Sequence, residues 1–283
     1  MNLQEIIKIH EEVLYPLVRV RTEKAGGSGL IIYSKPTPDN KKVYETYVVT
    51  CQHVVDDAIK FVKKWSSIAQ REITVEDRQL VQVEVFKYEK LSRCIGGTTY
   101  QAEIIAWDKQ MDIAVLKIRS EEPFKYVAKI YPKGKSDEIK LGTPVMACGC
   151  SMGHEPLFTF GNLVSKHDMI ENKEYWMSTA NTIFGNSGGA VFLKDTHEYI
   201  GNTARITAIQ LGFGVDVITW MGFFVPIDSI YEFFDENFLQ FIYDPNYTSK
   251  QCEEMRRKKQ EEEERKLLIP QKTDNVIEVK KVA

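Results

Sequence analysis

The sequence of 283 residues contains no long apolar run and no marked excess of either charge. No stretch approaches the ~18 consecutive apolar residues that a membrane-spanning helix needs. The segment from Met1 to Glu5 has neither the basic start nor the apolar stretch of a secretory signal. A net charge of −3 gives no reason to expect nucleic acid or an anionic membrane as a partner. We therefore expect a cytoplasmic protein that binds neither nucleic acid nor membrane.

Cysteine is also scarce, because the chain has five, an odd number that does not suggest a framework of disulfides. Reduced thiols fit an intracellular setting. Cys148 and Cys150 with nearby His154 are metal-ligand residue types, but no second cluster completes a set of four. We expect no metal and no cofactor. The hydrophobic fraction of 43% is ordinary for a globular protein, so composition alone names no function.

The most informative stretch runs from Thr182 to Phe192, where Ser187 stands among three glycines and is followed by apolar β-formers. Glycines beside a serine permit a sharp turn that leaves the hydroxyl uncovered. They also let a substrate approach the backbone, so that nearby N–H groups can face a developing negative charge. This pattern is typical of an enzyme that uses serine as its nucleophile.

The same residues fit the G-x-S-x-G pattern of α/β-hydrolases, but the surrounding sequence does not. That fold needs a helix after the serine, whereas Ala190 to Leu193 reads as a strand. It also needs a distant histidine downstream, and the only candidate, His197, is too near. A histidine and an aspartate should therefore lie upstream, in the order His, Asp, Ser.

Both residues are present in strong local contexts. His53 ends a buried-strand pattern that begins at Tyr47, and Asp112 opens another that ends at Ile118. With the serine segment these motifs resemble the trypsin-like serine peptidases, and within them the HtrA/Deg group, which is marked by T-x-x-H-V, D-I-A-[VL]-L-K and G-N-S-G-G. Residues 27–32 and 222–226 also resemble the opening and closing strands of that group, so the resemblance covers about residues 18–226.

The resemblance implies a serine endopeptidase that works through an acyl-enzyme and needs no cofactor. Ser187 would be the nucleophile, His53 the general base and then acid, and Asp112 the carboxylate that orients the imidazole. The backbone N–H groups of Gly185 and Ser187 would form the oxyanion hole. Two alternatives remain open: a catalytically silent scaffold or binding protein, and an esterase or thioesterase on the same fold.

The resemblance also indicates a pocket for the substrate side chain before the cleaved bond. Asn181 stands where trypsin has an aspartate, so we expect a small or medium uncharged side chain there. Asn186 replaces the aspartate that binds a freshly cut N-terminus in digestive enzymes, so we expect no activation by such a cut. The pocket residues expected from the family pattern are Asn181, Phe184, Gln210, Leu211, Gly212 and Phe224.

The strand patterns and the resemblance together predict an all-β protease domain over residues 18–243, with two six-stranded antiparallel β-barrels at about 18–118 and 140–226. Residues 1–17 show a helical stripe, with Asn2 as its N-cap, that either packs on a barrel or serves as a regulatory arm. Residues 56–65 are expected to form an amphipathic helix after the histidine. A terminal helix is expected at 228–243, opened by a capping box of Ser229 and Glu232.

The chain changes character at residues 244–283, which carry many charges. Acid-first i,i+4 pairs predict a solvated helix; they are Glu253/Arg257, Glu254/Lys258, Glu261/Arg265 and Glu262/Lys266. The apolar residues from Leu267 onward either bind a partner or fray. The HtrA group usually carries a PDZ domain at this place, and we expect these roughly 40 residues to be too few for one. Expected partners are a protein or peptide substrate and either a sister subunit or another protein, bound through the N-terminal helix or this tail.

Overall fold

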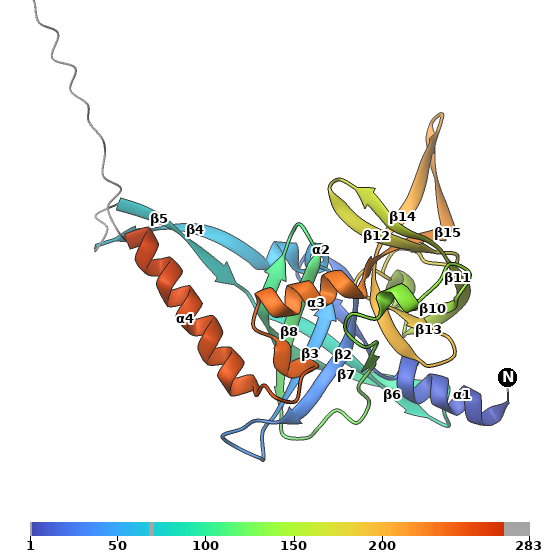
Figure 1. Ribbon diagram of the computed structural model, residues 1–283, viewed down its shortest axis with the longest axis horizontal. Coiled ribbons are helices and arrows are strands. Elements are labelled where there is room, and N and C mark those ends of the chain that lie inside the picture. Colours follow the sequence, from blue (N-terminus) through green and yellow to red (C-terminus); the bar gives the residue numbers. More distant parts are fainter. Residues whose placement is uncertain (1, 68–70, 269–283) are drawn as a thin grey trace, which may run out of the picture.

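The computed structural model describes residues 2–67 and 71–268 (Figure 1). The strands of its first half are β1 (Leu17–Arg21), β2 (Gly26–Pro36), β3 (Tyr44–Thr50), β4 (Ile59–Ser66), β5 (Arg71–Arg78), β6 (Val81–Glu89), β7 (Arg93–Asp108) and β8 (Ile113–Ser120). Six of them close a barrel in the order β1-β2-β3-β8-β7-β6, and its paired neighbours are antiparallel. The first predicted barrel is therefore confirmed.

The second half forms a sheet with one strand more than predicted. Its strands are β9 (Lys129–Ile130), β10 (Pro144–Gly149), β11 (Leu157–Ile170), β12 (Lys173–Ser178), β13 (Ala190–Leu193), β14 (Glu198–Leu211) and β15 (Gly214–Pro226). They pair in the order β13-β10-β11-β12-β15-β14-β9, and a further β13–β14 pairing joins six of them into a ring. The seventh, β9, adds to β14 in parallel through the pairs Glu198–Lys129 and Tyr199–Ile130. The expected plain six-stranded barrel was wrong in this respect, because a two-residue strand leaves no periodic signal in the sequence.

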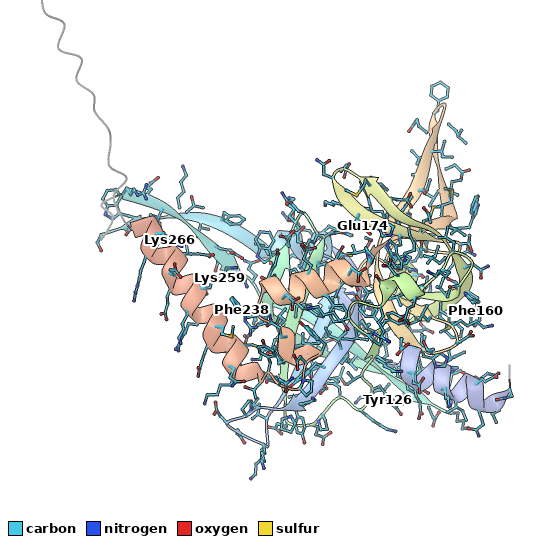
Figure 2. All side chains as sticks on the ribbon, in the orientation of Figure 1. Tyr126, Phe160, Glu174, Phe238, Lys259 and Lys266 are labelled. Carbon is cyan, nitrogen blue, oxygen red and sulfur yellow. The ribbon has the colours of Figure 1, made fainter. Side chains whose placement is uncertain are left out.

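The hairpin of β14 and β15 extends well beyond the ring and projects from the molecule (Figures 1 and 2). Its outer part pairs from Thr207 with Ile218 to Leu211 with Gly214. Gly212 has a φ of +56°, which suits the tight turn, and Phe213 beside it is fully exposed.

The segment after His53 is a strand and not the predicted helix. A short helix α2 (Gln52–Val55) and a single turn at residues 56–58 follow β3, and β4 then pairs with β5 as a separate two-stranded ribbon. Ile59, Phe61 and Trp65 lie at odd positions, so they fit a strand of period two as well as a helical stripe. The contact of the Phe61 ring with Trp107, at 6.2 Å between centroids, helps hold the ribbon beside the barrel.

The predicted N-terminal helix is present and packs against the core. Helix α1 (Leu3–Ile9) starts with a capping box in which Asn2 and Glu5 exchange hydrogen bonds, and a π-helical turn continues it to Leu14. Ile9, Val13 and Leu14 are buried in the main hydrophobic cluster.

The expected helix at 228–243 is shorter and starts earlier. Helix α3 (Ile227–Glu236) has Pro226 as its N-cap and no side-chain cap, so the predicted capping box was wrong. The helix ends at Asn237, and Phe238 follows with a φ of +51°, which a helix cannot accommodate. Only a 3₁₀ turn, Gln240–Ile242, occupies the remainder.

The charged segment is helical as predicted, forming α4 (Ser249–Leu268). The pair Glu262/Lys266 forms at 3.0 Å, whereas Arg257 pairs with Glu261 instead of Glu253. Figure 2 shows Lys259 and Lys266 along this helix, and the ammonium group of Lys259 lies 5.8 Å from the Phe238 ring. The apolar tail from residue 269 onward lies outside the described residues.

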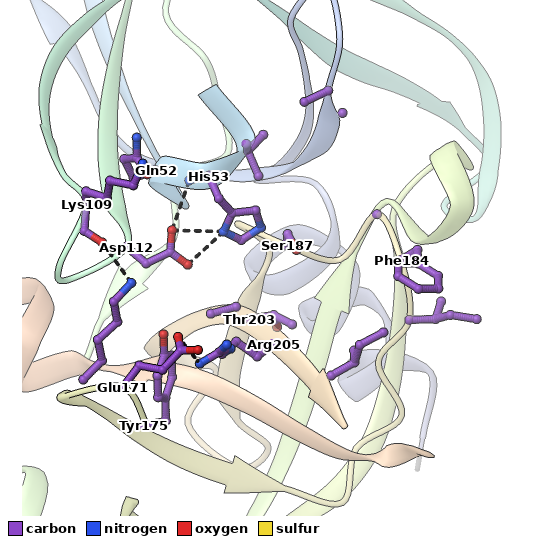
Figure 3. Close-up of a pocket in the computed structure, with 18 residues that line it drawn as sticks. Gln52, His53, Lys109, Asp112, Glu171, Tyr175, Phe184, Ser187, Thr203 and Arg205 are labelled. Carbon is purple, nitrogen blue, oxygen red and sulfur yellow. Dashed lines mark hydrogen bonds and ion pairs between the residues drawn. The ribbon is translucent and has the colours of Figure 1, made fainter. Parts of the chain in front are cut away.

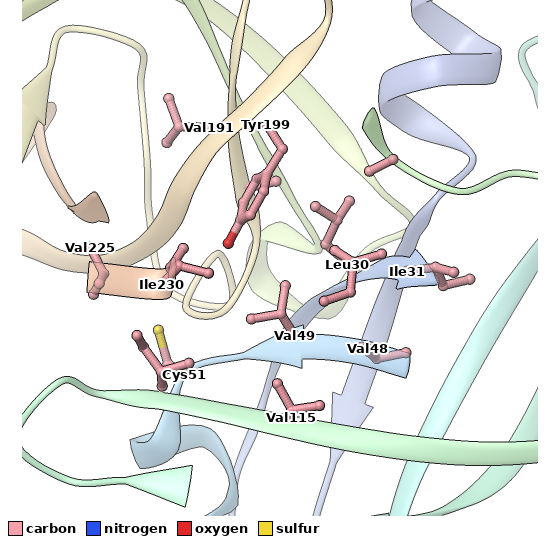
Figure 4. Packing of buried hydrophobic residues seen from close by; sticks show 14 of the residues in the cluster. Leu30, Ile31, Val48, Val49, Cys51, Val115, Val191, Tyr199, Val225 and Ile230 are labelled. Atoms are coloured by element: carbon pink, nitrogen blue, oxygen red, sulfur yellow. The ribbon is translucent and has the colours of Figure 1, made fainter. Parts of the chain in front are cut away.

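One hydrophobic cluster joins the two halves of the protein (Figure 4). It includes Val49 and Val115 of the barrel, Val191 and Tyr199 of the ring-shaped sheet, and Ile230 of α3. All five cysteines are free thiols. Among the described residues, no helix has the length and apolar character to cross a bilayer.

Candidate active site

The sheets bring His53 and Asp112 together at the edge of the first barrel. Asp112 occupies the turn between β7 and β8, and its side chain is only 8% exposed. The Nδ1 atom of His53 lies 2.8 Å from one carboxylate oxygen and 3.0 Å from the other. The backbone N–H of His53 also donates to this carboxylate, at 3.0 Å. A carboxylate at Nδ1 favours the tautomer that leaves Nε2 free to accept a proton.

Ser187 opens onto the same cavity, which has a volume of about 560 Å³ and is also lined by His53 and Asp112 (Figure 3). The imidazole is 45% exposed, so a substrate can reach it. Within residues 2–67 and 71–268 no hydrogen bond joins His53 to Ser187. In enzymes without substrate this bond is often long, and it tightens when substrate binds.

The loop before Ser187 contains the two backbone N–H groups that are expected to form the oxyanion hole. The carbonyl of Phe184 accepts a hydrogen bond from the N–H of Met152 at 2.7 Å. Because a trans peptide points its N–H opposite to its C=O, the N–H of Gly185 faces away from Met152. In the described part of the chain, neither this N–H nor that of Ser187 donates a hydrogen bond to another protein group. Gly185 has a φ of +94°, which only glycine adopts readily.

A fully buried residue that the sequence did not single out as functional, Ser28, holds this loop. Its hydroxyl donates to the carbonyl of Gly185 and accepts from the N–H of Cys150, each at 2.7 Å. Its own N–H donates to the carbonyl of Ser187 at 2.8 Å. The sequence offered only a weak signal, a serine between two glycines in a predicted strand.

Asn186 is buried in the same loop and hydrogen-bonds inside the protein. Its side-chain oxygen accepts from the hydroxyl of Ser151 at 2.6 Å. The buried Asn186 side chain is therefore held by a neutral hydrogen bond and not by an ion pair.

The expected pocket residues are only partly brought together. Of that set, Phe184 alone lines the cavity and is 62% exposed. Asn181 lies on the surface, where its carbonyl accepts from Thr159 at 2.8 Å, and Phe224 is a core residue packed edge-on against Trp176. Residues 210–212 lie at the turn of the projecting hairpin. The structure therefore does not bring these residues to the cavity.

The cavity is lined instead by Ile183 and by residues 203–206 of β14. Two backbone hydrogen bonds place Thr203 beside the serine loop: its N–H donates to Gly189 at 2.9 Å, and its carbonyl accepts from Gly188 at 2.8 Å. The misplacement has a physical cause. The strand β14 is long enough to hold both Thr203 and Leu211, and only strand pairing shows which part of it passes the serine.

Two charged residues that line the cavity form an ion pair. Arg205 forms an ion pair with Glu171 at 3.0 Å and lies over the ring of Tyr175, with 5.8 Å to its centroid. Burial, with a smaller contribution from the charge of Asp112, raises the pKa of Tyr175 to about 12. The phenol therefore stays neutral at physiological pH.

Cys51 lies close enough to His53 and Asp112 for their potential ligand atoms to fall within 4.8 Å of one another. The Cys51 thiol is fully buried and donates to the carbonyl of Thr203 at 3.3 Å. Burial, and then the charge of Asp112, raises its pKa well above the usual value. Since metals bind the thiolate, this neutral thiol is suited to packing.

Comparison with known proteins agrees with this geometry. Residues 27–201 match the family described as trypsin-like peptidase domain. The chain is 29% identical over 216 residues to "Putative protease Do-like 14" of Arabidopsis thaliana, covering 73% of this chain and 40% of that protein. It is 30% identical over 167 residues to "Serine protease HTRA2, mitochondrial" of Bos taurus, covering 56% and 31%.

A third relative is "Probable periplasmic serine endoprotease DegP-like" of Hahella chejuensis, which is 32% identical over 130 residues. That match covers 45% of this chain and 25% of the relative. The matched regions thus cover 25–40% of the length of these relatives.

Proposed function

This chain belongs to the trypsin-like peptidase family and has HtrA/DegP-like relatives, and from that premise we propose that it is a serine endopeptidase. It cleaves peptide bonds with Ser187 as nucleophile, His53 as general base and acid, and Asp112 as the orienting carboxylate. The observation that carries the proposal is the bonded His53–Asp112 pair, which opens onto the same cavity as Ser187.

The proposed reaction has two halves. The hydroxyl of Ser187 attacks the substrate carbonyl while Nε2 of His53 takes its proton, and Asp112 stabilises the imidazolium. The N–H groups of Gly185 and Ser187 stabilise the oxyanion, and His53 then protonates the leaving amine. In the second half His53 deprotonates a water that attacks the acyl-enzyme, and His53 then passes this proton to Oγ of Ser187 as the second product leaves.

A fluorophosphonate probe combined with a protein substrate tests this proposal. We expect labelling and cleavage, both absent in Ser187→Ala. Ser92→Ala is the matched control, because the Ser92 hydroxyl also bonds a histidine, His10, at 2.9 Å. Labelling must persist in that variant. Asp112→Asn should lower kcat by about 10⁴-fold, as the same change does in trypsin.

The two alternatives give different results in the same experiment. A silent scaffold shows neither labelling nor cleavage. An esterase or thioesterase is labelled at Ser187 and hydrolyses activated esters, but leaves casein and unfolded proteins intact.

A further inference from the structure

A second, smaller cavity of about 210 Å³ adjoins the one that holds the proposed catalytic residues. Gly26 and Gly185 line both cavities, so the two meet at these glycines. The scissile carbonyl, if it binds the N–H of Gly185, lies at this junction. A bound peptide then extends into one cavity before the cleaved bond and into the other after it.

The residues that line each cavity indicate which side of the cleaved bond it binds. Residues just before Gly185 are the expected border of the pocket for the side chain before the cleaved bond. Two of them, Ile183 and Phe184, line the larger cavity. The smaller cavity therefore faces the leaving-group side of the substrate.

Two arginines of β1, Arg19 and Arg21, line the smaller cavity, together with uncharged residues. They are two positions apart and so point to the same face of the strand. Val18 and Val20, which alternate with them, are fully buried in the barrel. Both guanidinium groups thus belong to the outer, cavity face of β1.

The charge of Arg19 is already compensated. Its Nε donates to Glu84 at 2.9 Å, its Nη2 contacts the same carboxylate, and its Nη1 donates to the carbonyl of Gly153. Its guanidinium also lies over the ring of Phe86, 5.4 Å from the centroid. Arg19 is therefore a fixed part of the wall.

Arg21 differs in this respect. It is exposed, and its partners across the strands, Gly26 and Gln82, carry no charge. Among residues 2–67 and 71–268 no acidic side chain lies within ion-pairing distance of it. The cavity thus retains one uncompensated positive charge beside the junction.

We propose that the smaller cavity is a substrate subsite for an acidic side chain on the leaving-group side of the cleaved bond, with Arg21 as its cationic partner. A guanidinium can bind a carboxylate through two parallel hydrogen bonds, which an amide side chain of the same size cannot match. The inference rests on the proposed function and names a substrate class for that site.

The test uses peptides in matched pairs. Cleavage sites in a denatured protein mixture are first identified by mass spectrometry, and one is made as a quenched fluorescent peptide. Glutamate is then compared with glutamine at each of the first two positions after the cleaved bond. At one of them we expect a ~3- to 10-fold higher kcat/KM for glutamate, as for a partly exposed charge pair. The preference should shrink as salt rises.

Two variants test the role of Arg21. Arg21→Gln should remove the preference, and Arg21→Glu should reverse it toward lysine. Arg119→Gln is the matched control, because Arg119 is an exposed arginine of the same barrel that lines a different cavity beside α4. It should leave the preference unchanged. Circular dichroism checks that each variant is folded.

The outcomes separate this inference from the proposed function. Equal rates for glutamate and glutamine, or a preference that persists in Arg21→Gln, overturn the subsite while leaving the peptidase proposal intact. If no peptide or protein is cleaved and Ser187 is not labelled, the proposed function fails and the subsite fails with it.

Discussion

Ser28 shows how one buried hydroxyl can control the shape of a reactive loop. It bonds the carbonyl of Gly185 and the N–H of Cys150, two groups that would otherwise lack partners in the interior. With the Gly185 carbonyl held there, the peptide between Gly185 and Asn186 cannot turn freely. This peptide lies between the two proposed oxyanion donors, the N–H groups of Gly185 and Ser187. Ser28 is thus a positioning residue that acts through the proposed oxyanion loop.

We predict that Ser28→Ala lowers kcat by about 10-fold or more and changes KM much less, because loss of one oxyanion donor costs about 10²-fold to 10³-fold. Steady-state kinetics with a peptide substrate measures the split. Thr46→Val is the control, since the buried hydroxyl of Thr46 shares a similar hydrogen bond with Ser34, at 2.7 Å, elsewhere in the barrel. Equal losses of kcat in the two variants would show that Ser28 acts only through stability.

At the scale of elements, a buried ion pair within the barrel lies beside α4. Lys117 of β8 and Glu45 of β3 are each 3% exposed, and their charged atoms lie 2.9 Å apart. Glu253 of α4, which is 59% exposed, approaches the same ammonium at 3.6 Å. The lysine therefore has one essential and one peripheral partner.

We predict that Lys117→Ala lowers the free energy of unfolding by about 3–5 kcal/mol, because it leaves Glu45 buried without its cation. Glu253→Ala should cost at most about 1 kcal/mol, since it removes only an exposed partner. Urea unfolding followed by circular dichroism compares the two. A loss in Glu253→Ala as large as that in Lys117→Ala would mean that α4, and not the buried pair, dominates.

For the molecule as a whole, buried tyrosines limit stability at high pH. Burial, and then the charge of Glu45, raises the pKa of Tyr33 to about 12. Burial also raises the pKa of Tyr175 to about 12. These phenols are neutral in the folded protein and ionise more readily once unfolded.

The folded pKa values exceed the unfolded value of 10.0, so this stabilisation is complete below pH ~10 and is lost as pH rises from ~10 through ~12. We predict cooperative unfolding in that range, with tyrosinate absorbance and circular dichroism changing together. Tyr33→Phe should weaken the pH dependence. Ionisation of all the tyrosines with no change in circular dichroism would contradict the prediction.

Strong periodic patterns predicted most strands, because burial on one or both faces of a sheet fixes which positions must be apolar. The strands next to His53, Asp112 and Ser187, which are β3, β8 and β13, are of this kind. The patterns failed at residues 59–65, where the apolar positions fit the period of a helix and that of a strand equally well. They also failed at β9, which is too short to show a period. They also failed at the start of α3, where Pro226 and not Ser229 is the N-cap.

The sequence by itself determined the class of protein and the residues proposed for its chemistry, because their motifs are local and depend on neighbours along the chain. Only the tertiary structure decided that Ser28 holds the loop, that residues 203–206 and not 210–212 line the cavity, and that Arg21 stands beside the junction. Those relations join segments far apart in the chain. They arise from strand pairing and register, which the order of residues along a single strand does not reveal.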